Sequence, residues 1–347
     1  MYNEFIVRMN MAPVNSFLYK TKDVRTGRLM VKREKMYFDS RDGMNKIQAV
    51  EWIPDVEQPL FILQIIHGMT EYMARYDDFA CSMAQKGVLV VGEDHLGHGC
   101  SVKKGGVYGY FCEQDPATVV VRDSHRLKKM IQEKYPGIPY AILGHSLGSY
   151  ILRNYLCRYG TGIQAAIIMG TGMPSKPLLA AGKAVAALQK LFLGDKHPSR
   201  LLDKMTFGTY NNRIKDNRTP NDWLTRDEAI VDAYNKDPLC GFTFTVNGFR
   251  TCFELISRLH KKENLDKMPK ELPVLFLSGE EDPVGGYGKG VKTAFRSFQE
   301  EGMKKIQMKL YKDDRHELLN ETDRAAVYED IYTWLASVLT GSNPDRK

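Results

Sequence analysis

The sequence predicts an α/β fold in which helices cover both faces of a mostly parallel central sheet. Short, continuously apolar runs are typical of strands that are buried on both faces. Amphipathic stretches of helical period lie between these runs, and such an alternation favours parallel strands joined by crossovers. The expected strands are residues 60–66, 88–92, 140–143, 165–169, 274–278 and 306–311, and the expected helices include 76–85, 119–134, 289–300 and 323–339.

A hairpin precedes this alternation. Two strand-like runs, residues 30–38 and 46–52, flank the sequence DSRDG, whose composition is typical of a turn. Residues 1–30 show no clear period and are expected to form an N-terminal extension. The main domain is therefore predicted to comprise residues 31–172 and 273–347.

Residues 173–272 interrupt the alternation of strands and helices. They contain no obvious buried strand but include an alanine- and leucine-rich stretch at 177–193. At the carboxyl edge of the sheet, an insertion of this kind would cover the crevice in which open α/β sheets bind ligands. We therefore expect a mainly helical cap or lid, with a helical decoration elsewhere on the surface as the alternative.

The composition is that of a globular enzyme, since 43% of the 347 residues are hydrophobic and 26% are charged. The net charge is +7, but the basic residues are scattered and form no run typical of nucleic-acid-binding arms. The six cysteines form no CxxC pair and show no zinc-ligand spacing with histidines. The N-terminus lacks the features of a signal peptide, and no run of apolar residues is long enough to cross a bilayer. We expect a cytoplasmic protein with reduced cysteines and no nucleic-acid partner.

A candidate nucleophile stands in the stretch YAILGHSLG, residues 140–148, which places Ser146 between two glycines after an apolar run. Strand, tight turn and helix form the context in which G-x-S-x-G is a nucleophile elbow. Gly144 and Gly148 let the strand and the helix approach closely, because a Cβ atom there would clash. The alternative is a chance match in an ordinary turn between a strand and a helix.

A serine hydroxyl is a poor nucleophile at neutral pH and needs a histidine that takes its proton. In hydrolases with this elbow the base follows the serine along the chain. Three histidines qualify: His197 within the cap, His260 in a charged helical stretch, and His316 after the last strand. His316 is preferred, because its loop would open at the carboxyl edge of the sheet.

The acid that orients the base should follow the strand predicted at 274–278. Glu280, Glu281 and Asp282 compete there. Asp282 is preferred because the proline after it restricts its backbone to an extended or turn conformation. Asp313 and Asp314 are expected to be charges on the surface of the next loop.

An oxyanion hole requires two backbone N–H groups that face the developing negative charge. Leu147, directly after the nucleophile, would supply one of them. Met69 would supply the other, in the loop HGMTE that follows an early strand. His67, in the same loop, is expected to support the loop rather than to act in the chemistry.

Five motifs resemble those of the monoglyceride lipase and lysophospholipase group of the α/β-hydrolase fold, in a form similar to its bacterial members. They are H-G-x-x-E at 67–71, D-x-x-G-H-G-x-S at 94–101, G-H-S-x-G at 144–148, and the acid and base loops at 279–285 and 315–317. The resemblance covers residues 30–340. The second motif is expected to shape its loop rather than to take part in the chemistry.

The chain departs from the group at two positions. Leu96 stands where many relatives have arginine, and Tyr72 stands where histidine often follows the glutamate. Neither position belongs to the expected proton relay of Ser146, His316 and Asp282.

The resemblance implies a serine ester hydrolase that cleaves single-chain acyl esters, such as monoacylglycerols or lysophospholipids, without a cofactor or a metal. A thioesterase, an acyltransferase or an aminopeptidase on the same scaffold is the alternative. A binding protein on an inactive hydrolase fold is disfavoured, because all three candidate triad residues are present.

The helix expected at 177–193 has one apolar face. Leu178, Val185, Leu188 and Phe192 recur at intervals that place them on this face. Three partners are open for it: an acyl chain above Ser146, a lipid surface that opens the cap, or the sheet domain itself. A transient contact with a membrane is therefore one of the expectations.

Overall fold

The computed structural model describes residues 31–341, so the predicted extension at 1–30 lies outside the described residues. A single sheet of eight strands has the order β1-β2-β4-β3-β5-β6-β7-β8. Strand β2 pairs antiparallel with β1 and with β4. The other neighbouring pairs in this order, from β4 with β3 to β7 with β8, are parallel. The strands are β1 (Lys32–Asp39), β2 (Lys46–Ile53), β3 (Ile62–Ile66), β4 (Leu89–Glu93), β5 (Tyr140–His145), β6 (Ala165–Met169), β7 (Val274–Gly279) and β8 (Ile306–Tyr311). The predicted mostly parallel sheet and its leading hairpin are confirmed.

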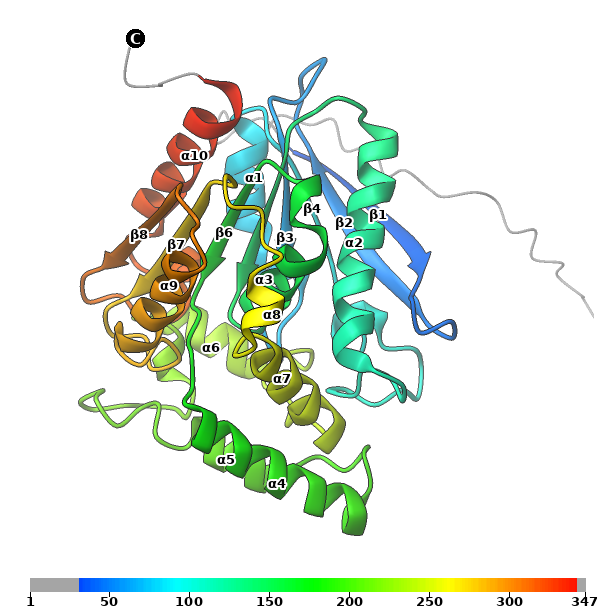
Figure 1. The fold of residues 1–347 in the computed structure, drawn as a ribbon, viewed down its shortest axis with the longest axis vertical. Helices are drawn as coiled ribbons and strands as arrows, with labels where there is room; N and C mark the ends of the chain where they lie inside the picture. The colour runs from blue at the N-terminus through cyan, green and yellow to red at the C-terminus, as the bar shows by residue number, and fades with distance from the viewer. Residues whose placement is uncertain (1–30, 342–347) are drawn as a thin grey trace, which may run out of the picture.

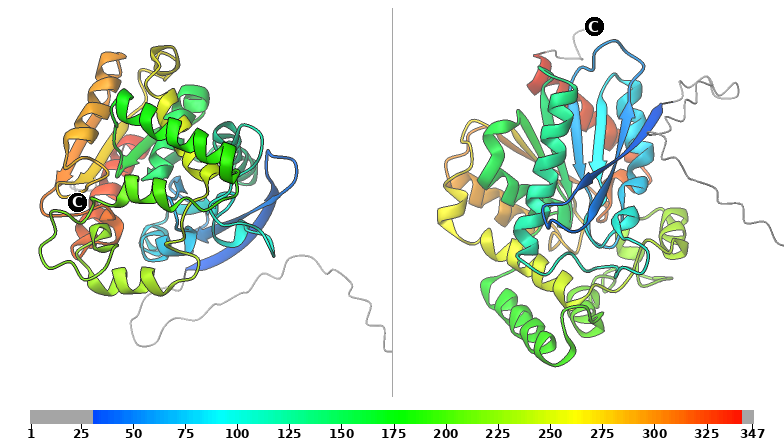
Figure 2. Two further views of the ribbon diagram at one scale, coloured as in Figure 1. Left: turned by 90° about the horizontal axis from the view of Figure 1, so that it is seen from below. Right: turned by 90° about the vertical axis from the view of Figure 1, so that its right-hand side faces the viewer.

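Helices cover both faces of this sheet (Figure 1, Figure 2). Apolar residues of α2, α3, α7 and α9 form one buried cluster with one face of the sheet, and those of α1 and α10 form a second cluster with the other face. The α-helices are α1 (Asp77–Gln85), α2 (Pro116–Lys134), α3 (Leu147–Tyr159), α4 (Lys176–Leu193), α5 (Arg200–Phe207), α6 (Glu228–Lys236), α7 (Val246–Arg258), α8 (Lys262–Leu265), α9 (Lys289–Glu300) and α10 (Arg324–Thr340).

Local sequence accounts for where these elements begin and turn. The hairpin between β1 and β2 closes through a hydrogen bond from Ser40 N to Asn45 O (2.8 Å) and through Asp42, whose carboxylate accepts from Met44 N (2.8 Å). Helix α2 begins at Pro116, after Asp115, whose carboxylate accepts a hydrogen bond from the N–H of the third helical residue.

Strands β3, β5, β7 and β8 run in parallel, so the loops after them meet at one edge of the sheet. The loop after β3 carries Met69, the turn after β5 carries Ser146, and the loops after β7 and β8 carry Asp282 and His316. Four segments that are far apart in the sequence therefore converge on the edge where open α/β sheets bind ligands.

The segment between β6 and β7 contains helices α4 to α8 and the 3-10 helix Asp222–Leu224. Its one β-bridge among the described residues, Pro198 with Thr245, lies outside the sheet. Helix α7 packs on α2 and α3, whereas α4 and α5 lie together beyond the end of the sheet (Figure 1, Figure 2). Among residues 31–341, no helix is long and apolar enough to span a membrane.

Helix α4 directs its apolar face to solvent. Leu188 and Phe192 are 59% and 76% exposed, and Leu178 is also exposed, while Val185 is half-buried. The side that packs on the molecule buries Leu179 and two small residues, Gly182 and Ala186. The expectation that the face of Leu188 and Phe192 packs on the sheet domain is therefore wrong.

Candidate active site

Ser146 lies in the turn between β5 and α3 with φ 54° and ψ −119°, a backbone conformation that is strained for a residue with a side chain. Its N–H donates to Met169 O at 3.0 Å, which ties the turn to β6. A Cβ atom on Gly148 would lie 1.9 Å from the carbonyl oxygen of Ile66. The second glycine of the motif is therefore required for α3 to pack against the end of β3.

His316 and Asp282 form a buried pair at this turn. The Nδ1 atom of His316 lies 3.0 Å from Oδ1 of Asp282, and the two side chains are 2% and 0% exposed. Nε2 is then the ring nitrogen of His316 that does not contact Asp282, and His316 lines the same pocket as Ser146. Burial alone would raise the pKa of Asp282, but the charge and hydrogen bond of His316 and the N–H of Val284 hold this pKa below its usual range.

The competing acids and bases lie elsewhere. Glu280 and Glu281 are exposed, whereas Asp282 is buried. His197 is exposed on the cap. The ring of His260 contacts the carbonyl of Pro174 at 2.9 Å, at the start of the cap segment. Of the candidates considered, Asp282 and His316 are the two that the fold places together.

The two predicted oxyanion donors lie on either side of Ser146. Leu147 is the first residue of α3, where backbone N–H groups have no partner within the helix. Met69 lines the pocket with Ser146. The loop of Met69 approaches the nucleophile closely, since a Cβ atom on Gly68 would lie 3.0 Å from the Cβ of Ser146.

Glu71 fixes the loop that carries Met69. Its carboxylate accepts from Gly68 N (2.5 Å) and Tyr76 OH (2.7 Å) and pairs with Arg75 (2.9 Å). Burial would raise the pKa of Glu71, but the hydrogen bond and charge of His145 and the charge of Arg75 keep it below its usual range. The carboxylate of Glu71 therefore holds the backbone of the loop that carries Met69.

The same network continues to the loop of the base. Arg75 makes a two-pronged ion pair with Glu317, at 2.5 and 2.7 Å, directly after His316. The Nε2 atom of His145 contacts the carbonyl oxygen of His316 at 3.2 Å. Burial opposes protonation of His145, but the hydrogen bond and charge of Glu71 raise its pKa overall. No local pattern predicts the pair of Arg75 and Glu317, because the two residues lie far apart in the chain.

Both ring nitrogens of His67, in the loop after β3, contact backbone groups. His67 Nδ1 donates to Gly68 O (2.8 Å), and its Nε2 accepts from His95 N (3.0 Å). Asp94 accepts from the N–H groups of Met73 (2.9 Å) and Cys100 (2.8 Å), so the turn at 94–101 is shaped by its own polar groups. Burial lowers the pKa of His67, in keeping with a neutral ring that supports the loop.

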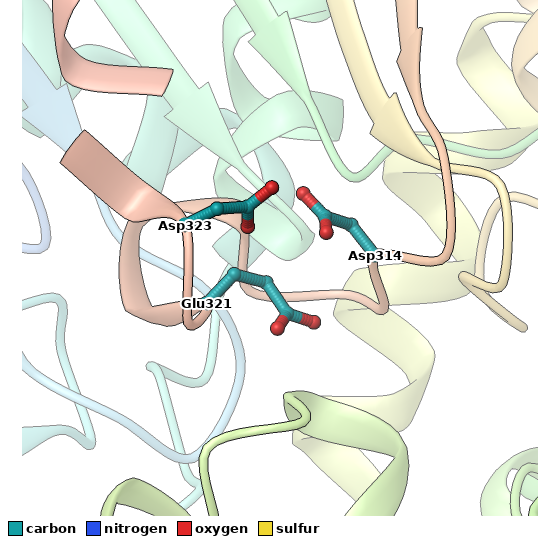
Figure 3. Close-up of side chains that lie close together, drawn as sticks. All are labelled: Asp314, Glu321 and Asp323. Carbon is teal, nitrogen blue, oxygen red and sulfur yellow. The ribbon is translucent and has the colours of Figure 1, made fainter. Parts of the chain in front are cut away.

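Asp314 is buried, so the expectation that it is a surface charge is wrong. Its carboxylate lies beside those of Glu321 and Asp323, and one carboxylate oxygen from each of the three lies within 4.8 Å of the others (Figure 3). Arg226 from the segment between β6 and β7 contacts all three carboxylates. The sequence could not show this burial, because the arginine that compensates the charge lies far away in the chain.

The pocket above Ser146 has a volume of about 790 Å³. It is lined by Ser146, His316 and Met69 and by residues of the segment between β6 and β7 such as Phe207, Trp223 and Phe242. Helix α5 lines the pocket, whereas among the described residues none from α4 does. The expectation that Leu188 and Phe192 cover an acyl chain above Ser146 is therefore wrong.

Comparisons with known proteins identify the family of the chain. Residues 57–323 match the protein family described as serine aminopeptidase, S33. The chain is 27% identical to a monoglyceride lipase of Rattus norvegicus over 80% of this chain and 83% of that protein. It is 25% identical to a monoacylglycerol lipase of Mycolicibacterium smegmatis over 83% and 92% of the two chains.

A solved structure of similar architecture is a thermostable carboxyl esterase from Bacillus coagulans in complex with glycerol. It is 29% identical and superposes with a TM-score of 0.81 over 88% of this chain and 99% of that one. The sheet order, the converging loops and the match over residues 57–323 lead to one assignment. The chain belongs to the serine aminopeptidase S33 family, and it is a hydrolase of the α/β-hydrolase fold that is similar to the monoglyceride lipases.

Proposed function

We propose that the protein hydrolyses carboxylic esters through an acyl-enzyme on Ser146. His316 takes the proton of the serine hydroxyl and passes it to the leaving alcohol, while Asp282 orients the ring and stabilises the imidazolium. The N–H groups of Leu147 and Met69 bind the oxyanion. The observation that carries the proposal is the buried bond of Asp282 to His316, which lines the same pocket as Ser146.

Single-chain acyl esters, such as monoacylglycerols or lysophospholipids, are the proposed substrates. The names of the relatives support this class, and so does a pocket of about 790 Å³ with aromatic walls. Its outer part is polar, with Asn212 and Asn217 exposed at the side of the cap. Each methylene of an acyl chain that the walls cover would contribute about 0.8 kcal/mol to binding.

We further propose that α4 docks on a lipid surface, from which such substrates are taken. Its outward face carries Leu188, Leu191 and Phe192, each more than half exposed, and Leu201 of the neighbouring α5 is also exposed. The exposed lysines Lys183 and Lys190 of α4 lie on other faces of the helix, where they pair with Glu254 and Asp195. An exposed apolar surface on a chain of net charge +7 fits the interface of an anionic bilayer.

A panel of substrates with the same acyl chain tests the proposed reaction. The panel comprises a monoacylglycerol, a lysophospholipid, a thioester and an aminoacyl amide. We expect ester cleavage to exceed amide cleavage by orders of magnitude and to become more efficient with acyl length until the pocket is filled. Faster cleavage of the amide or the thioester would replace the proposed ester hydrolase by one of those activities.

A further inference from the structure

One aromatic side chain of the segment between β6 and β7 contacts the proposed base. Trp223 lies in the 3-10 helix Asp222–Leu224 and lines the pocket, yet it is only 8% exposed. The ring centroids of Trp223 and His316 lie 5.1 Å apart, with the ring planes inclined by 41°. The indole and the imidazole are therefore neighbours inside the pocket, although they lie far apart in the chain.

Other side chains of the same segment fix the orientation of the indole. Phe207 stacks on Trp223 with centroids 6.0 Å apart and planes at 14°, and Tyr210 packs against it edge-on at 4.9 Å. The backbone N–H of Trp223 donates to Oδ1 of Asn211 at 2.9 Å. The ring thus has little freedom to turn away from His316.

The backbone around Trp223 is bonded to the loop of the base on both sides of His316. The side chain of Arg315 donates to the carbonyl oxygen of Asp222 at 2.7 Å. The backbone N–H of Glu317 donates to the carbonyl oxygen of Leu224 at 2.7 Å. The residues that flank the histidine thus hold the residues that flank the tryptophan. This segment is part of the active-site framework.

A buried charge cluster strengthens this attachment. Arg226 pairs with Glu321 at 3.0 Å and Asp323 at 2.9 Å, and it also contacts Asp314. Asp314 and Glu321 are fully buried, so removing Arg226 from them would leave uncompensated charges inside the protein. Burial and the charge of Glu321 raise the pKa of Asp314 to about 7.

We propose that Trp223 is a positioning residue that stabilises the imidazolium form of His316 through the face of its indole ring. The inference rests on the proposed role of His316 as the base. In acylation, the Ser146 proton moves to Nε2 as the Oγ–carbon bond forms and the carbonyl electrons move onto oxygen. The ring then carries a positive charge, and a cation within about 6 Å of an indole centroid is stabilised by its π electrons.

Three further groups act on the charge of His316. Asp282 accepts from its Nδ1, the ring of His145 lies 4.7 Å away, and Glu317 follows it in the chain, paired with Arg75. None of these groups changes when Trp223 is replaced by an analogue of the same shape. The effect of the indole can therefore be separated from theirs.

Stepwise fluorination of the indole tests the proposal. Mono-, di- and trifluorotryptophan at position 223 keep the shape of the ring and withdraw its π electrons. With a dissolved acetyl ester, we expect kcat to fall with each fluorine, by about 3- to 30-fold in all. KM should change little, and the acidic limb of the pH–rate profile should move to lower pH. The same series at Trp334, in α10, is the matched control and should leave kcat unchanged.

Two substitutions distinguish stabilisation of the imidazolium by the ring face from simple exclusion of water. Trp223→Phe should retain much of kcat, whereas Trp223→Leu should lose the full effect and move the acidic limb to lower pH. A flat fluorination series, or a limb that moves to higher pH in Trp223→Leu, would show that the indole only excludes water and would overturn the inference. A parent enzyme without esterase activity would instead overturn the proposed function.

Discussion

Single residues of the active site act through buried charges, each held by a partner. Asp282 bonds to His316, and Glu317 and Glu71 share Arg75. A buried charge without its partner is costly, so each pair holds two loops in one arrangement. The proposed proton relay and the proposed oxyanion hole are thereby connected through the side chains of Glu71, Arg75 and Glu317.

Removal of the Asp282 charge is the first prediction at this scale. Asp282→Asn keeps the shape but cannot stabilise the imidazolium, so kcat for an ester should fall by about 10³- to 10⁴-fold. Steady-state hydrolysis of a chromogenic ester measures it, with Glu281→Gln as the exposed control, which should stay within a few-fold of the parent. The opposite ranking would assign the acid to Glu281.

Replacement of Arg75 is the second prediction. Arg75→Met leaves the carboxylates of Glu71 and Glu317 buried without their cation, which should lower the free energy of unfolding by about 3–5 kcal/mol. Urea unfolding measures the loss. Arg33→Met removes an exposed pair with Asp77 and should cost at most about 1 kcal/mol. Equal losses in the two variants would contradict the account of the network.

Sequence reasoning can propose residues whose chemistry requires a fixed local context. Ser146 follows from its elbow, and Asp282 and His316 follow from their places after strands. Asp314 was assigned wrongly, because its burial depends on Arg226, which no local pattern connects to it. Trp223 was missed for the same reason, since its contact with the base exists only in the folded chain.

At the scale of elements, the strand and helix periods predict the sheet and most of its helices. The orientation of α4 could not be predicted in this way. Its sequence offers an apolar face with Leu188 and a face of small residues with Gly182 and Ala186, and the molecule packs on the latter. Small residues allow close approach of helices. A hydrophobicity pattern does not take this into account, so it favours the face with the larger apolar side chains.

The exposed face of α4 carries the third prediction. Leu188→Asp with Phe192→Asp should reduce sedimentation with anionic phosphatidylglycerol vesicles and hydrolysis of lipid-embedded substrate at least tenfold. Hydrolysis of a dissolved short-chain ester and the melting temperature should stay unchanged, because both side chains are exposed. Val56→Asp, at an exposed apolar residue in the loop between β2 and β3, is the control. Unchanged vesicle binding, or a large fall in melting temperature, would contradict the docking proposal.

At the scale of the whole molecule, a polar network lies inside the core between the sheet and α2. Glu93, at the end of β4, accepts from Gln64 Nε2 at 3.2 Å and bonds to Ser124 of α2. Tyr140 OH donates to Gln64 at 2.7 Å. Burial raises the pKa of Glu93 to about 8. The predicted strand at 88–92 ended before this residue, so its burial was not foreseen.

The charge state of Glu93 gives the fourth prediction. Between its ordinary value of 4.5 and about 8, the folded protein holds a proton that the unfolded chain has released. The contribution of Glu93 to the free energy of unfolding therefore falls as pH rises through that window, by about 1.4 kcal/mol per pH unit. Glu93→Gln should remove this slope, as judged by urea unfolding at about pH 6 and about pH 8. Glu57→Gln, at an exposed glutamate, should retain it.

The central claim is that Ser146 is the nucleophile of a serine hydrolase, and covalent labelling tests it most directly. The intact protein is treated with a fluorophosphonate, digested and analysed by peptide mass spectrometry. We expect one adduct, on the peptide that contains Ser146, a much slower reaction in His316→Ala, and no adduct in Ser146→Ala. An adduct on another serine, or labelling that persists in Ser146→Ala, would contradict the claim.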